Sequence, residues 1–191
     1  MKTLSIIAVL LLAFQTHAQQ DPQYTQYMYN MNVVNPAYAG SKEGLSFGLL
    51  YRTQWSGIDG APNTGTFSGH SPLGNNMGIG LSIISDQIGP VNETNVYADV
   101  SYTLRFGGEH RLAFGVKAGA TFHDIGLSGI DLIDQGDPFF QDISKTTPNF
   151  GAGLFYFTET YYLSLSVPNL LSSVHLDADG FKIGSETIII Y

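Results

Sequence analysis

Apolar and polar residues alternate strictly along much of the chain beyond its first eighteen residues. In residues 95–106 the even positions are apolar or aromatic, and the odd positions are mostly polar. Residues 111–122 repeat this alternation, and residues 107–109, with two glycines, lie between the two segments. A period of two is typical of a β-strand with one apolar face, and a short glycine turn predicts a hairpin. We therefore expect an antiparallel β protein.

Weaker copies of the same alternation raise the expected number of strands to about eight. They cover residues 45–51, 64–70, 77–83, 150–156, 161–167 and 186–191. Long connections are expected at residues 54–63, 85–93, 124–148 and 168–185, with short turns between them. Strands of about ten residues and this alternation of long and short connections are typical of outer-membrane β-barrels.

The alternation alone does not decide which face of the sheet meets lipid. A secreted β-sandwich or a lipocalin-like barrel would turn the apolar face inward. We favour a transmembrane barrel because the other face is rich in Gly, Ser and Thr and carries few charges. Aromatic residues near the strand ends could then form interfacial girdles: Tyr51, Phe106, Phe122, Tyr156, Tyr161 and Tyr162.

Residues 1–18 have the pattern of an export signal. Lys2 precedes an apolar run over residues 4–14, and Ala18 supplies a small residue at the expected cleavage position. The run is shorter than the ~20 residues that a membrane-spanning helix needs. We expect cleavage after Ala18.

Composition narrows the possible functions. The chain has 191 residues, a net charge of −8 and no cysteine, and only 13% of its residues are charged. An acidic chain without clustered Lys and Arg is a poor nucleic-acid binder. Without cysteine there are no disulfides, thiolate metal sites or cysteine nucleophiles.

Residues 19–43 form a separate segment before the expected barrel strands of residues 44–191. Tyrosine and methionine alternate there with Gln and Asn, which suggests a plug-like segment, or a periplasmic one, that docks against the barrel wall. Pro36 restricts Asn35 to an extended conformation, so the chain is expected to turn there. Gly40 can adopt backbone angles that other residues avoid.

An ordered series of motifs over the mature chain resembles the PorP/SprF family of Bacteroidetes outer-membrane proteins. The motifs are DPQYTQYMYN, NPAYAG, YRTQWSGIDGAP, FSGHSPL and GIGLSIISDQIG. The resemblance implies an outer-membrane β-barrel of the type IX secretion and gliding-motility machinery, which helps to secrete adhesins or to hold them at the cell surface. The residues that we single out from these motifs as interaction candidates are Tyr24, Tyr27, Asn35, Pro36, Ala37, Gly40, Arg52 and Trp55.

The resemblance also implies partners and a larger barrel. The expected partners are outer-membrane lipids, the periplasmic ring lipoprotein and its partner, the translocon, and a secreted adhesin. Family members are usually longer, and residues 188–191 look like the middle of a strand. We therefore expect these strands to be part of a larger, C-terminally incomplete barrel.

Patterns that could indicate catalysis or metal binding are weak in this sequence. Residues 44–48 match G-x-S-x-G, but Ser46 lies within an alternating strand instead of at a strand-to-helix turn. Residues 175–186 imitate a calcium loop with His175 at the first ligand position, so a surface turn is the preferred interpretation. A loose calcium site there, or around Asp131, Asp134, Asp137 and Asp142, stays open.

We therefore expect a non-enzymatic interaction component with no catalytic residue, cofactor or metal site. The main alternative is an outer-membrane porin or small-solute transporter. A third possibility is a lipid-acting barrel enzyme that depends on Ser46 or His70.

Overall fold

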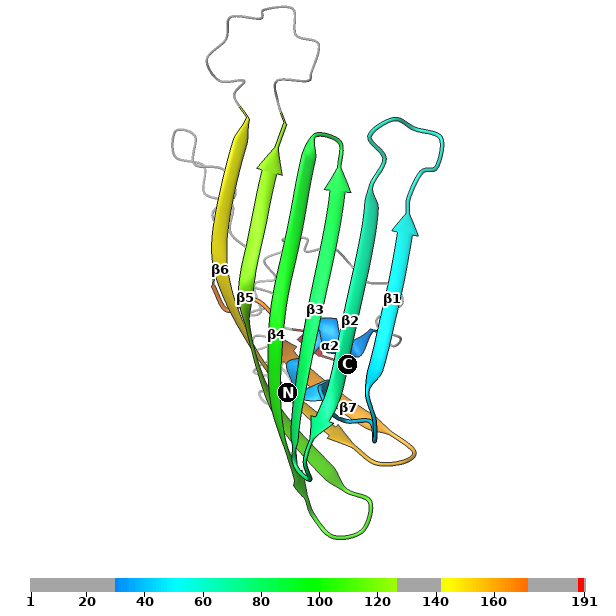
Figure 1. The fold of residues 1–191 in the computed structure, drawn as a ribbon. Helices are drawn as coiled ribbons and strands as arrows, with labels where there is room; N and C mark the ends of the chain where they lie inside the picture. The colour runs from blue at the N-terminus through cyan, green and yellow to red at the C-terminus, as the bar shows by residue number, and fades with distance from the viewer. Residues whose placement is uncertain (1–29, 127–141, 172–188, 191) are drawn as a thin grey trace, which may run out of the picture.

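The computed structural model describes residues 30–126, 142–171 and 189–190. These residues form a single antiparallel sheet in which each strand pairs with the next one along the chain (Figure 1). The strands are β1 (Ser46–Thr53), β2 (Asn63–Leu73), β3 (Met77–Ile88), β4 (Val91–Arg105), β5 (Arg111–Ile125), β6 (Ile143–Phe157), β7 (Tyr162–Val167) and β8 (Ile189–Ile190).

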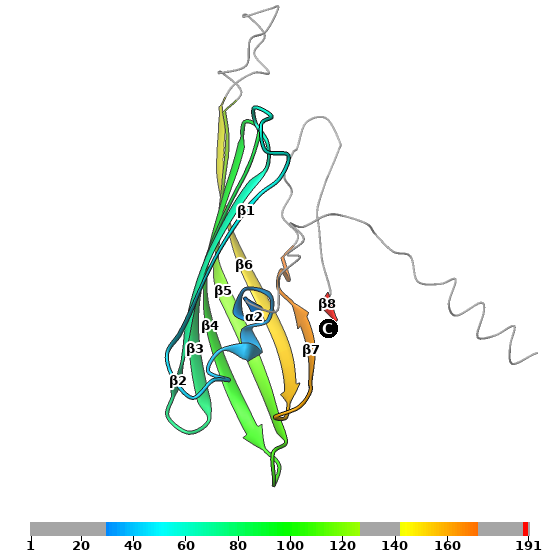
Figure 2. The ribbon, with the colours of Figure 1, turned by 90° about the vertical axis from the view of Figure 1, so that its right-hand side faces the viewer.

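The sheet is curved, and two short helices lie on its concave side (Figure 2). They are α2 (Met31–Val34) and the 3₁₀-helix η2 (Pro36–Tyr38). Within the described residues, β1 pairs only with β2, so the curved sheet is a half-barrel with an open edge.

Among the residues that the structure describes, no helix is long and apolar enough to span a bilayer.

The apolar face of the sheet is the convex one. Ile79, Val100 and Val116 lie opposite one another on β3, β4 and β5, and each side chain is exposed. The neighbouring residues along each strand face the concave side instead. There, polar groups such as Asp99, next to Val100, and Lys117, next to Val116, are almost completely buried. This arrangement is the reverse of a soluble sandwich, in which the apolar face is buried. It places the apolar side chains where lipid would meet them.

The convex apolar surface has the height of a membrane core. On β4 it extends from Val96 to Leu104, roughly 26 Å at ~3.3 Å per residue, and an outer-membrane barrel carries a band ~25 Å tall. No charged side chain lies on the described convex face within this band. Beyond the band, the row of convex positions that includes Asn92, four residues before Val96 on β4, is wholly polar. Its paired residues are Thr53, Asn63, Gln87, Asn92, Asp124 and Ser144.

Some sequence expectations about connections and strand length were wrong. Residues 85–93 do not form a long connection, because β3 continues to Ile88 and β4 begins at Val91. Strands β4, β5 and β6 have 15 residues each, not about ten. The additional residues carry the polar rows beyond the apolar band, which a search for apolar alternation misses.

One residue expected in an aromatic girdle lies on the other face. Tyr162 is on the concave side, with its ring centroid 5.7 Å from that of the buried Phe155.

Several expectations fall outside the described residues. These are the export signal and its cleavage after Ala18, the positions of Tyr24 and Tyr27, the calcium-like residues 175–186, and Asp131, Asp134 and Asp137.

The orientation of the sheet predicts that charge is tolerated differently along the convex face. Val100→Arg, in the middle of the apolar band, should destabilise the protein in a bilayer by about 2–4 kcal/mol. Gln87→Arg, in the polar row, should cost about 0–1 kcal/mol. Denaturant titration of the protein folded into phospholipid vesicles measures both values. Equal costs would contradict the assigned band.

Candidate functional site

A row of small residues crosses the concave face of the sheet. On β3 to β7, directly paired positions carry Gly78, Ser101, Gly115, Gly153 and Ser166, which we call the small-residue row. These residues leave a shallow floor on the inside of the curved sheet.

Residues 30–40, which we call the clasp, lie directly on this floor. A Cβ atom added at Gly115 would overlap the backbone of Pro36 and Ala37, and one at Gly153 would overlap the side chain of Asn35. At Gly78 the added atom would overlap the carbonyl group of Ala39. The glycines are therefore required by the close approach of the clasp backbone.

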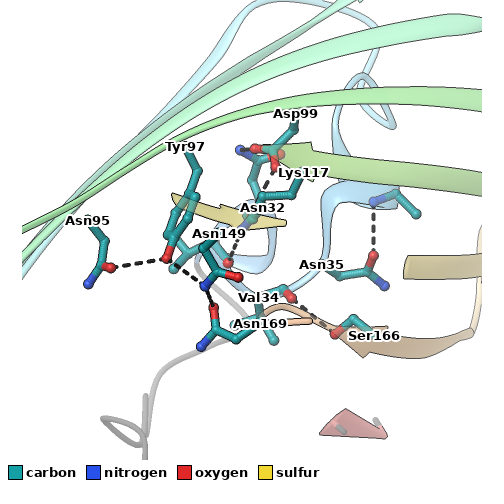
Figure 3. Close-up of polar contacts among 12 residues, drawn as sticks. Asn32, Val34, Asn35, Asn95, Tyr97, Asp99, Lys117, Asn149, Ser166 and Asn169 are labelled. Atoms are coloured by element: carbon teal, nitrogen blue, oxygen red, sulfur yellow. Dashed lines mark hydrogen bonds and ion pairs between the residues drawn. The ribbon is translucent and has the colours of Figure 1, made fainter. Parts of the chain in front are cut away.

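Asn35 fixes the point at which the clasp turns back across the sheet. Its amide Nδ2 donates to the carbonyl oxygen of Leu154 at 2.9 Å and to Oγ of Ser164 at 2.8 Å. Its Oδ1 accepts a hydrogen bond from the backbone N–H of Ala37 at 2.9 Å, which caps η2 (Figure 3). Asn35 is fully buried, so these three bonds satisfy an amide that water cannot reach.

A buried lysine holds the first half of the clasp. Lys117 Nζ donates to the carbonyl oxygens of Val33 at 2.5 Å and Asn32 at 3.5 Å. It also lies 3.8 Å from Oδ1 of Asp99 and 5.0 Å from the ring centroid of Tyr97. Asn32 Nδ2 in turn donates to Oδ2 of Asp99 at 3.1 Å. The ammonium group is thus paired with a carboxylate and hydrogen-bonded to carbonyl groups of α2 (Figure 3).

Further hydrogen bonds attach the clasp across the width of the sheet. Ser166 Oγ donates to the carbonyl oxygen of Val34 at 3.0 Å, and Ser101 Oγ donates to that of Ala39 at 2.5 Å. At the ends of the clasp, Asn30 Nδ2 donates to Thr66 Oγ1 and Gly40 N–H donates to Nδ1 of His70. The clasp thus bonds side chains or carbonyls on five strands, β2, β4, β5, β6 and β7.

The remaining clasp contacts are apolar and aromatic. Met31 and Ala37 pack with Ala113 and Phe155 in a small buried cluster. The ring centroid of Tyr38 lies 5.2 Å from those of His70 and Phe155, with edge-on geometry to both.

A network of polar side chains lies beside the clasp. Tyr97 OH donates to Asn95 Oδ1 at 3.0 Å and accepts from Asn149 Nδ2 at 3.3 Å. Thr121 Oγ1 also donates to Asn95 Oδ1, and Asn149 donates to Oδ1 of Asn169 (Figure 3). The arrangement cross-links β4, β5 and β6, and it reaches a carboxylate through Asn95 Nδ2, which donates to Oε1 of Glu93 at 2.7 Å.

The structure places four of the predicted interaction residues, Asn35, Pro36, Ala37 and Gly40, in the clasp, where they are buried or half-buried. Arg52 lies on the concave side, opposite Thr64. Trp55 follows β1 with 69% of its surface exposed and a left-handed φ of 51°. Those of the predicted residues that the structure describes therefore do not form one site.

Lys117, Asp99 and the glycines beneath the clasp were not predicted from the sequence. Asp99 and Lys117 lie directly opposite each other in the predicted hairpin. The register of the predicted hairpin places these opposite charges across from each other on the polar face, so an ion pair between the two strands could have been predicted from the sequence.

Ser46 and His70, the residues of the enzyme alternative, are directly opposite each other on β1 and β2. Ser46 Oγ donates to the carbonyl oxygen of Gly44 at 3.4 Å, whereas His70 Nδ1 accepts from Gly40 N–H at 3.2 Å. Each group thus bonds to backbone, and the His70 ring packs on Tyr38 of the clasp. In the described part of the chain, no three His, Asp or Glu side chains are grouped to hold a metal ion.

Comparison with known proteins identifies a family. The family described as Type IX secretion system membrane protein PorP/SprF matches residues 16–189. No curated protein and no solved structure shows significant similarity to the chain.

Removing the Asn35 side chain should release the turn of the clasp. Asn35→Ala removes three hydrogen bonds: the Leu154 carbonyl and the Ser164 hydroxyl lose their donor, and the Ala37 N–H loses its acceptor. We therefore expect a loss of about 2–4 kcal/mol. The matched control is Asn76→Ala, which removes an exposed 3.4 Å bond to Tyr102 and should cost less than about 0.5 kcal/mol. Denaturant titration in detergent micelles compares them. Similar stabilities of the two variants would refute the anchoring role.

Filling the small-residue row should displace the clasp. Gly115→Ala places a methyl group against the Pro36–Ala37 backbone, and we expect a cost of about 1–3 kcal/mol. Gly44→Ala, where nothing lies within 4 Å of the added atom, should change stability by less than about 0.5 kcal/mol. If Gly115→Ala proves as stable as Gly44→Ala, the clasp does not rest on this row.

Proposed function

The chain belongs to the PorP/SprF family of type IX secretion system membrane proteins, and on this basis we propose that it is a non-enzymatic outer-membrane component of that machinery. It supports secretion or surface attachment of adhesins, in the context of gliding motility, through protein–protein contacts. Export would depend on the signal at residues 1–18, with cleavage after Ala18.

The observation that carries this proposal is the clasp on the concave face. A solute pore needs a water-filled lumen, and porin interiors are polar and hydrated. Here residues 30–40 occupy the inside of the curved sheet, and Asn35, Asp99 and Lys117 are almost completely buried beneath or within the clasp. A filled interior supports a scaffold that positions other proteins, and it argues against the porin or small-solute transporter alternative.

The two ends of the sheet differ in a way that suggests an orientation. The β2–β3, β4–β5 and β6–β7 connections are short and lie at one end, which we call the turn end (Figure 1). At the opposite end the β1–β2 and β5–β6 connections are longer, although the β3–β4 turn there has only two residues. Outer-membrane barrels have short periplasmic turns and longer external loops. The turn end would then face the periplasmic ring lipoprotein and its partner, and the opposite end would face the exported adhesin.

The β1–β2 connection at that opposite end is held by backbone hydrogen bonds and exposes two large apolar side chains. Gln54 N–H donates to the Pro62 carbonyl at 3.0 Å, and Gly89 N–H of the β3–β4 turn donates to the Gly60 carbonyl at 2.9 Å. Trp55 and Ile58 are 69% and 64% exposed on this held loop. Exposed aromatic and aliphatic residues on a fixed backbone are favourable contact points, so this loop is our candidate surface for the translocon or the adhesin.

Cross-linking of the tagged full chain in native outer membranes, followed by mass spectrometry, tests the proposal. We expect recovery of periplasmic ring components, the translocon or a large surface adhesin, and loss of the external partner from the Trp55→Ala variant. Leu73→Ala, an exposed apolar residue at the turn end, is the control. Recovery of abundant porins alone would contradict the interaction role.

The same purified protein also distinguishes the alternative. In planar bilayers the intact chain should give no stable conductance, because the clasp fills the interior. A steady ohmic pore would favour the porin function instead.

A further inference from the structure

Two arginines lie directly opposite each other where the concave face reaches the turn end. Arg105 is the last residue of β4 and Arg111 the first of β5, and the two are paired in the antiparallel register. Both share the concave side with Ser101 and Ala113, because side chains alternate along each strand. Like charges at directly opposed positions repel each other.

Neither arginine is neutralised by a carboxylate within the described residues. Arg105 Nη2 donates to the backbone carbonyl oxygen of Asn75 at 2.8 Å, and the Arg111 guanidinium lies 5.7 Å from the ring centroid of Phe157. The carboxylates in the adjoining turns, Glu109 and Glu159, form no ion pair with either arginine there. The two guanidinium groups therefore point toward different neighbours, one along the β2–β3 turn and the other over β6.

An aromatic surface continues from Arg111 to the clasp. The Phe157 ring stacks on Phe155 with centroids 5.0 Å apart, and Phe155 contacts both Tyr162 and Tyr38. Tyr162 is exposed, whereas Phe155 is buried. The mouth of the half-barrel at the turn end thus combines two uncompensated cations with an aromatic floor.

From this geometry we propose that the turn-end mouth is a docking site for an acidic polypeptide segment, held by Arg105 and Arg111 against the aromatic floor. The proposal rests on the role in protein–protein contacts given above and names the chemistry of one partner. Arginine binds carboxylates through paired N–H donors, and Arg105 keeps donors free beyond its single backbone bond.

A polypeptide fits better than a lipid headgroup or a single anion. Lipid lies against the convex apolar band, whereas both arginines belong to the concave side. Because the two guanidinium groups diverge, they suit two carboxylates spaced along a chain. The whole protein has a net charge of −8, so general electrostatics would repel an acidic peptide, and any attraction must be local.

Fluorescence anisotropy of the full chain in zwitterionic detergent tests the site. The probe is a fluorescein-labelled peptide of alternating Glu and Tyr, and a peptide with Gln in place of Glu is the probe control. We expect binding of the Glu peptide only, weakened roughly three- to fivefold by Arg105→Ala or by Arg111→Ala, and further by both, with an affinity that falls as salt rises. Lys145→Ala, which removes a cation from the opposite end of the sheet, should leave binding unchanged.

The outcomes separate this inference from the proposed function. Equal binding by the double arginine variant and the unchanged protein, or equal loss in Lys145→Ala, overturns the docking site. Full competition by inorganic phosphate at constant ionic strength, or by anionic lipid added to the detergent micelles, overturns the choice of a polypeptide. None of these results depends on the cross-linking experiment, so the docking site can fail while the secretion role stands.

Discussion

The contact between residues 35–37 and the small-residue row governs how the concave side of this protein is built. A sheet that turns its apolar face outward must satisfy its inward polar groups without a hydrophobic core. The clasp does so by bringing backbone carbonyls and asparagine amides within hydrogen-bonding distance of strands β2, β4, β5, β6 and β7. Only Gly and Ser leave enough room for this approach, and so the glycine content of the chain is a packing requirement at these positions.

The buried ion pair follows from the same constraint. Placing an ammonium and a carboxylate away from water is costly unless each is fully paired. Lys117 meets this condition only with the clasp present, because its two hydrogen-bond acceptors are the carbonyl groups of Asn32 and Val33. The buried lysine therefore depends on the position of the clasp, since without the clasp it would lose both acceptors.

The strands were predictable because alternation reports directly on a sheet with two unlike faces. Where both faces are polar, as in the outer parts of β3 and β4, the alternation disappears, so the predicted end of β3 was too early and the predicted start of β4 too late. The turn at Asn35–Pro36 was readable from the proline, but its position over Gly115 and Gly153 was not. That contact joins residues about eighty or more positions apart, and no local pattern encodes it. The choice between a lipid-facing and a core-facing apolar surface likewise required the fold, because period-two alternation is the same in both.

The clasp also has a consequence for the order in which the chain can complete its structure. It precedes every strand in sequence, yet Val34 is bonded to Ser166, 132 residues further on, and Asn35 to Ser164, 129 residues further on. Closing loops of this length costs entropy that only the finished contact repays. Until β7 is in place, Asn35 lacks the Ser164 hydroxyl and the Val34 carbonyl lacks its donor. The clasp is thus synthesised before every described strand, yet its last contacts can form only after β7 has joined the sheet.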